Sequence, residues 1–248
     1  ADMHSRLPKD LPAAPPEPLE HAMMVARAGV LMRPGVERWR QWIAEAQEAR
    51  LSGRSLIERV GARTQAVLAA EQLKEYKLAR TIFTALQADV RGHAAAERQA
   101  RLMEAELALA GGDAPAALKA LGPAADKEPR PEMLLRAQAL LATGDAASVV
   151  GAMQTWVTLH PHDGAVWQAL AQVWRDEGQV LRSIRAEAEA QVAHYDYAGA
   201  VDRFRAGQDL ARKSSSSQDY IEASVIDTRL RAVKSLLDEQ TRERRLDQ

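Results

Sequence analysis

The chain has 248 residues, with 33 basic and 34 acidic side chains, and it contains no cysteine. Because these charges nearly cancel, no net field attracts nucleic acid, and we expect no nucleic-acid partner. The lack of cysteine excludes disulfides and thiol chemistry but is compatible with cytoplasm or periplasm, and no apolar run reaches the length of a membrane span. The alanine-rich apolar content, with only 4% aromatic residues, favours closely packed helices, so we predict an all-α fold.

The chain begins with a proline-rich segment. Residues 7–18, LPKDLPAAPPEP, hold five prolines, which exclude a regular helix and favour an extended conformation. We therefore expect residues 1–18 to be a linker that follows an upstream domain.

An N-terminal helical hairpin is predicted next, over residues 19–62. Two amphipathic stretches, 18–32 and 36–51, stand on either side of Pro34-Gly35. Proline followed by glycine ends one helix and permits a turn before the next.

The middle of the chain repeats with a period near 34 residues. Gly144 and Gly178 are 34 residues apart, and each has an alanine seven residues before it. Prolines stand seventeen residues after Gly112 and Gly144, so that a glycine ends one helix and a proline breaks the next. A small residue at the alanine position lets the two helices of a hairpin approach closely. These spacings predict helix-turn-helix repeats over residues 63–211.

This pattern resembles the tetratricopeptide repeat. The stretch from 164 to 178 carries residues of the family's first helix and its turn glycine, namely Trp167, Leu170, Ala171, Trp174 and Gly178. The small position of the second helix corresponds to Ala117, Val149 and Ser183. Departures from the pattern are Glu187 at an apolar position, and Glu104 and Arg136 in place of a leucine. The resemblance implies a degenerate, tetratricopeptide-like helix-hairpin solenoid.

A second signature occurs twice. The stretch YKLARTIF at 76–83 matches YAGAVDRF at 197–204 in its tyrosine, alanine and phenylalanine. In both, the phenylalanine lies one helical turn beyond the alanine, and we predict that both residues pack in the core.

The chain ends in a predicted capping helix. The segment KSSSS at 213–217 is expected to be a flexible break, and residues 218–240 show apolar side chains along one side of a helix. Such a helix would cover the exposed end of the last repeat.

The order of these elements is similar to the C-terminal half of BepA-type β-barrel-assembly-enhancing proteases. The similarity rests on the repeat array, the segment RAEAEAQVAHYDYAGAVDRFRAGQDLA, the polar break and the closing helix with DTRLRAVKSLL. Members of that family are periplasmic zinc metallopeptidases whose catalytic domain precedes the repeats. The resemblance therefore implies a periplasmic location and a zinc-binding domain upstream of this chain.

The chain itself shows no catalytic motif. A zinc peptidase of that family needs His-Glu-x-x-His, and none of the six histidines begins this motif. His160 and His162, on either side of Pro161, are interpreted as an inter-repeat turn rather than as metal ligands. No nucleophile stands in a known motif with its base, so we expect no enzymatic activity, no metal site and no cofactor in this chain, although a helical enzyme with an unrecognised site stays an alternative.

We expect the function to be protein binding. Stacked helix hairpins expose a groove along their first helices, and the family's groove positions correspond to Leu102, Glu106, Leu109, Leu134, Gln138, Leu141, Gln168, Gln172 and Arg175. We expect proteins or extended peptide segments as partners, because amides can pair with the backbone of an extended peptide while leucines accept its side chains. The expected role is to recruit substrates or partners, such as outer-membrane proteins or their assembly machinery, for the metallopeptidase. The alternative is a free-standing tetratricopeptide adaptor or co-chaperone.

Overall fold

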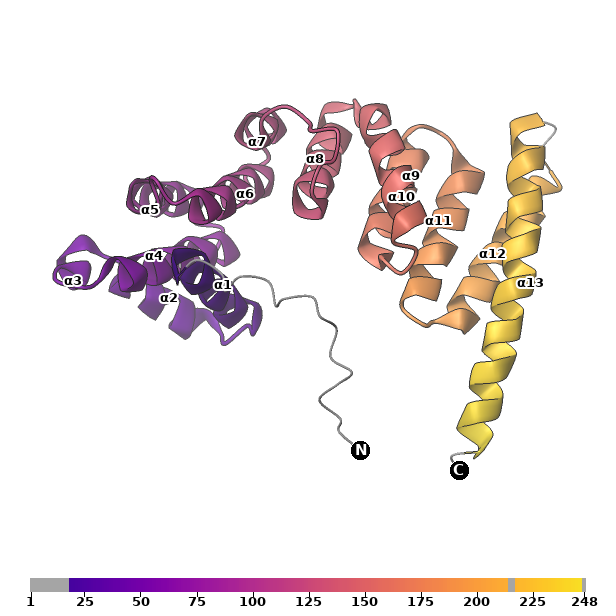
Figure 1. The fold of residues 1–248 in the computed structure, drawn as a ribbon, viewed down its shortest axis with the longest axis horizontal. Coiled ribbons are helices and arrows are strands. Elements are labelled where there is room, and N and C mark those ends of the chain that lie inside the picture. The colour runs from indigo at the N-terminus through magenta and orange to yellow at the C-terminus, as the bar shows by residue number, and fades with distance from the viewer. Residues whose placement is uncertain (1–17, 214–216, 247–248) are drawn as a thin grey trace, which may run out of the picture. The chain divides into compact units, whose positions relative to one another are not determined.

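A computed structural model describes residues 18–213 and 217–246 of the chain. Over these ranges the regular structure is helical and contains no strand, which confirms the all-α prediction. None of the helices in the described ranges has both the length and the apolar character that crossing a membrane requires. The helices divide into two compact units, one up to Gly111 and one from Gly112 (Figure 1).

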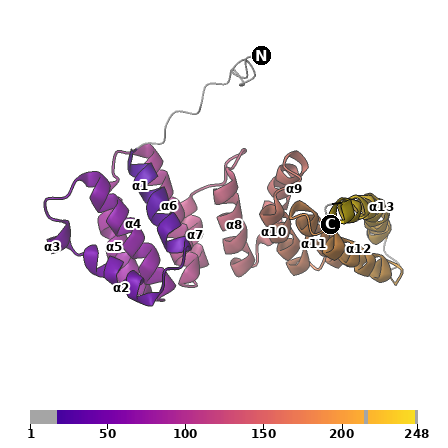
Figure 2. The same ribbon diagram turned by 90° about the horizontal axis from the view of Figure 1, so that it is seen from below.

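The first unit is built around one central helix. Its elements are α1 (Pro18–Leu31), α2 (Val36–Glu45), α3 (Glu48–Leu51), α4 (Leu56–Gln72), α5 (Tyr76–Asp89) and α6 (Ala94–Ala110). Helix α4 packs against α1, α2 and α5, and α1 also contacts α6 (Figures 1 and 2). The core of this unit contains Met23, Val60 and Phe83 from three of these helices. A capping box between Ser55 and Glu58 starts α4 by satisfying backbone donors of its first turn.

Two details of the N-terminal region differ from the predicted hairpin. The expected helix over 36–51 is interrupted, because Gln47 adopts an extended backbone (φ −64°, ψ 141°) between α2 and α3. This break accompanies the burial of Leu51 in the core. The expected boundary after residue 62 lies inside α4. The predicted linker lies outside the described residues, apart from Pro18, which begins α1.

The second unit is a succession of helices that pack on their neighbours in the chain. Its elements are α7 (Ala114–Leu121), α8 (Arg130–Thr143), the 3₁₀ helix η2 (Ala146–Val149), α9 (Val150–Leu159), α10 (Gly164–Asp176), α11 (Val180–Ala193), α12 (Tyr197–Ala211) and α13 (Ser217–Leu246). Helix α10 also contacts α8, and α11 also contacts α13. The predicted closing helix over 218–240 corresponds to α13, which packs on α12 (Figure 1).

Five turns between helices contain a residue with positive φ at a corresponding place. Its φ lies between 60° and 78° and it closely follows a helix, namely at Lys74, Gly112, Gly144, Gly178 and Tyr195; Gly122 after α7 has a similar φ of 71°, but its ψ of −166° lies outside the left-handed helical region. This left-handed conformation favours glycine and is typical of helix C-termini. The turns at Gly178 and Tyr195 are only seventeen residues apart, half the period between Gly144 and Gly178. Helix α11 therefore belongs to two consecutive hairpins, and the repeat shifts by one helix at this point.

The predicted small positions are buried. Ala105, Ala137 and Ala171, each seven residues before a turn glycine, are almost completely inaccessible to solvent. In the α10–α11 hairpin, the Ser183 hydroxyl donates a hydrogen bond of 2.8 Å to the carbonyl oxygen of Ala171. A serine fits there because the helices are close enough for its hydroxyl to reach the backbone of the other helix.

The two aromatic signatures also pack in the core as predicted. Ala79 and Phe83 of α5 are buried in the first unit, and Ala200 and Phe204 of α12 are buried in the second. Each pair lies on the helix that follows a left-handed turn at a non-glycine residue. The matching sequences thus mark equivalent second helices of a hairpin.

The charged departures from the repeat pattern have partners. Arg136 binds both carboxylate oxygens of Glu128, with a shortest distance of 2.6 Å, and donates to the carbonyl oxygen of Gly122. Glu104 accepts a hydrogen bond of 3.1 Å from the amide of Gln87. Ion pairs and hydrogen bonds therefore replace apolar packing at these positions, which explains how a degenerate repeat still folds.

Candidate protein-binding surface

The five turns define a common register for the predicted groove residues. The groove positions lie ten, six and three residues before the turn residue on α6, α8 and α10. The same offsets on the other two helices select Thr64, Leu68 and Glu71 of α4, and Arg185, Glu189 and Val192 of α11. We call these fifteen residues the register positions.

In the first unit these positions lie against α1. Arg27 of α1 binds both carboxylate oxygens of Glu106, at 3.0 and 2.6 Å. Gln99 and Glu20, each seven residues before Glu106 and Arg27 on the same helices, also form a pair: the Gln99 amide donates a hydrogen bond of 3.0 Å to Glu20. Because both pairs advance by seven residues along each helix, α1 and α6 run in the same direction. Of the predicted groove residues on α6, Leu102 is buried, Glu106 is ion-paired to α1 and Leu109 is half-buried.

A second carboxylate, that of Glu71 on α4, interacts electrostatically with both Arg27 and Glu106. Burial and the negative charge of Glu106 raise the pKa of Glu71, while Arg27 acts in the opposite direction. On α4, Thr64 and Leu68 are buried. The register positions of α4 and α6 are thus mostly closed to an external partner by α1, a relationship that their sequence spacing does not reveal.

In the second unit, α8 and α10 leave the register positions accessible. Gln138, Gln168, Gln172 and Arg175 are exposed, and Leu134 and Leu141 are half-buried at the edge of the core. Since α8 contacts α10, we call these six residues together the α8–α10 face. It combines two aliphatic side chains with three amides and one guanidinium, which can bind a peptide through both apolar contacts and hydrogen bonds.

Two arginines share one carboxylate at one end of this face. Arg175 of α10 and Arg203 of α12 both pair with Glu187 of α11, the residue that replaces an apolar one in the repeat pattern. The Arg175 side chain keeps 61% of its surface exposed. One carboxylate therefore serves two guanidiniums, and Arg175 has donors left for an acidic partner.

On α11 the register positions lie against α13. Arg185 pairs with Glu222, and Arg229 binds both oxygens of Glu189 at 2.6 Å. Glu189 follows Arg185 on α11, and its partner Arg229 follows Glu222 on α13. The two helices therefore run in the same direction. The guanidinium of Arg185 also lies 5.4 Å from the ring centroid of Trp174, a cation–π distance.

The turn at 160–163 has a structural role that sequence reasoning missed. Asp163 accepts hydrogen bonds from Arg130 (2.6 and 2.9 Å), from the Trp156 indole (2.9 Å) and from the backbone of Val166 at the start of α10. The hydrogen bond from Arg130 is the main cause that lowers the pKa of Asp163 to about 2. The signal in the sequence is an aspartate at the N-cap position of a predicted helix.

The two histidines of this turn lie at the surface. His160 and His162 are exposed, and His160 lies over the Trp156 ring at 4.3 Å between centroids. Within residues 18–213 and 217–246, no group of three histidine, aspartate or glutamate side chains is arranged to hold a metal ion. The described side chains around Asp163 are instead engaged in holding α9, α10 and the start of α8 together.

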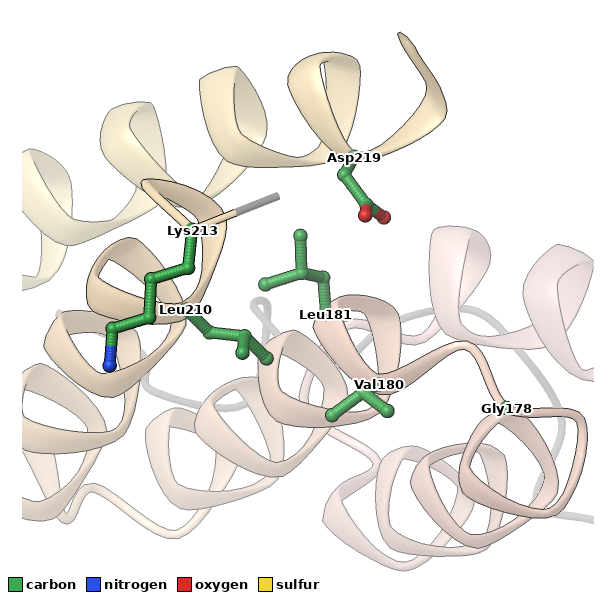
Figure 3. Close-up of a pocket in the computed structure, with 6 residues that line it drawn as sticks. All are labelled: Gly178, Val180, Leu181, Leu210, Lys213 and Asp219. Atoms are coloured by element: carbon green, nitrogen blue, oxygen red, sulfur yellow. The ribbon is translucent and has the colours of Figure 1, made fainter. Parts of the chain in front are cut away.

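A separate pocket of about 370 Å³ lies between the start of α11, the end of α12 and the start of α13 (Figure 3). Val180, Leu181 and Leu210 contribute apolar side chains to its lining, and Lys213 and Asp219 contribute charged ones. Its volume lies at the lower end of the range for small-molecule pockets, and its lining is mainly apolar. None of its residues belongs to the predicted groove.

Comparison with known proteins finds no protein-family model that matches the chain and no similar sequence among curated proteins.

Proposed function

We propose that this protein is a protein-binding helical-repeat scaffold whose binding surface is the α8–α10 face. The observation that supports this most strongly is the contrast among the five helices in register. The described structure largely covers the register positions on α4, α6 and α11, whereas on α8 and α10 four of the six are exposed. A surface of amides, leucines and an exposed guanidinium suits a polypeptide better than a small metabolite.

The resemblance to BepA-type proteases extends this proposal to a biological role. The scaffold would recruit substrates, or dock partners, for a periplasmic zinc metallopeptidase that acts in quality control of outer-membrane proteins. The zinc and the catalytic residues would belong to an upstream domain. The alternative, a free-standing adaptor, is distinguished by the gene sequence ahead of residue 1, which contains His-Glu-x-x-His only under the first proposal.

Site-specific photo-crosslinking tests the binding surface directly. A photoreactive amino acid is placed at Gln138 or Gln172 on the α8–α10 face and, as a matched control, at the exposed Ala152 of α9. The probe is an outer-membrane porin diluted from urea into the full chain. We expect adducts from the two face positions and none from Ala152. Equal yields at all three positions, or no adduct at any of them, would place the binding surface elsewhere.

A further inference from the structure

The partner's conformation can be inferred from how the chain covers its own register positions. On α6 and α4 the cover is α1, which binds Glu106 through Arg27 and lies near Glu71. On α11 the cover is α13, which binds Glu189 through Arg229. In both cases an α-helix runs in the same direction as the helix that it covers, and arginine–glutamate pairs join the two.

The α8–α10 face repeats this arrangement without a covering helix. Its half-buried Leu134 and Leu141 offer an apolar floor, as the buried Leu68 and Leu102 do beneath α1. Arg175, three residues before its turn, is the register equivalent of Glu71 on α4 and carries the opposite charge. Because Glu187 is shared between Arg175 and Arg203, the Arg175 guanidinium keeps donors for an acidic side chain of a partner.

We infer that the α8–α10 face takes an amphipathic α-helix that runs parallel to α8 and α10 and pairs an acidic side chain with Arg175. This inference rests on the proposed function and specifies its partner class. An extended peptide would form hydrogen bonds through its backbone to the three glutamines, whereas a helix satisfies its own backbone and contacts the face through side chains alone. Apolar residues at i, i+3, i+4 and i+7 of the partner would contact Leu134 and Leu141.

A helical and an extended partner can be distinguished by selecting binders for the full chain from two libraries of peptides of equal length. One library presents randomised side chains on a preformed amphipathic helix, and the other consists of linear peptides with a central proline that prevents helix formation. Each selected binder is then titrated against the original chain, Arg175→Glu and Gln172→Arg. The control is Arg231→Glu, since Arg231 is exposed on α13, away from the face.

We expect binders from the helical library, enriched in one acidic position. Arg175→Glu should weaken them about fivefold, the upper range for an exposed ion pair, and a lysine at the acidic position of the peptide should restore the affinity. Arg231→Glu should leave the affinity unchanged. Proline-containing binders that lose affinity in the face variants would overturn the helical partner while supporting the binding surface. A lack of any binder sensitive to Arg175→Glu or Gln172→Arg would overturn both.

Discussion

Arg27 and Glu106, 79 residues apart in the chain, form a two-point ion pair that joins α1 to α6. Glu71 lies close enough to both to feel their charges. Arg27 of α1 thus carries the positive charge that offsets two carboxylates at the register positions of the first unit.

Replacing Arg27 with methionine should destabilise the first unit. The change keeps the aliphatic stem but leaves Glu71 and Glu106 to repel each other without a cation. Since the two paired side chains are about a quarter exposed, we expect a loss of about 1 kcal/mol at pH 7. Urea unfolding at pH 7 and pH 4 measures it, and the loss should shrink at pH 4, because the raised pKa of Glu71 favours protonation of this carboxylate there. A pH-independent loss would indicate a packing effect instead.

Glu71→Gln should have the opposite effect. The pKa of Glu71 is raised in the folded protein, so its ionised form destabilises the fold at pH values above that pKa, and the penalty disappears as the pH falls. The amide variant should therefore melt at a higher temperature than the original chain at pH 7 and at the same temperature near pH 4. Exposed Glu75 replaced by glutamine serves as the control. A lower melting temperature for Glu71→Gln at pH 7 would show that the Arg27 attraction dominates.

Asp163→Asn should destabilise the second unit at neutral pH. The pKa of Asp163 is lowered from 3.8 to about 2, so its stabilising effect is present above the unfolded pKa and is lost as the pH falls through the folded pKa. The shift corresponds to up to about 2 kcal/mol. Asp196→Asn, at another N-cap that binds the backbone of Gly199, is the control and should change little. Chemical unfolding at pH 7 distinguishes the two, and similar losses would mean that capping, not Arg130, accounts for the effect.

Ala171→Leu should destabilise the α10–α11 hairpin by about 1–3 kcal/mol, because the added side chain has no room between the helices. The Ser183 hydrogen bond to the Ala171 carbonyl shows how close they are. Ala165→Leu on the exposed side of the same helix is the matched control. Thermal unfolding followed by circular dichroism measures both. Equal melting temperatures for the two variants would contradict the close contact.

Lys74→Gly should stabilise the first unit. Lys74 has φ 60°, a conformation that costs an L-residue about 1 kcal/mol and that glycine adopts freely. The reverse change, Gly144→Ala at φ 76°, should destabilise the equivalent turn of the second unit by a similar amount. Denaturant unfolding of each variant gives the two free energies, which should have opposite signs. The same sign for both would show that the turns are not equivalent.

The sequence by itself determined the helical class, the hairpin period and the buried small positions. These features depend on local spacing: Gly144 and Gly178 end helices, and Ala137 and Ala171 lie seven residues before them. Such signals act within one or two helical turns, so a single chain displays them directly.

Only the tertiary structure decided which register positions stay open. Leu102 and Gln138 have the same predicted groove role, yet Leu102 is buried while Gln138 is exposed. The contacts that close the first set, such as Arg27 with Glu106, join residues far apart in the chain. Their spacing carries no periodic signal, because long-range pairing depends on how whole helices pack and not on neighbouring residues. The sequence pattern also does not show that α11 belongs to two hairpins. The turn after α11 has Tyr195 at the position where the other repeats of the second unit have glycine.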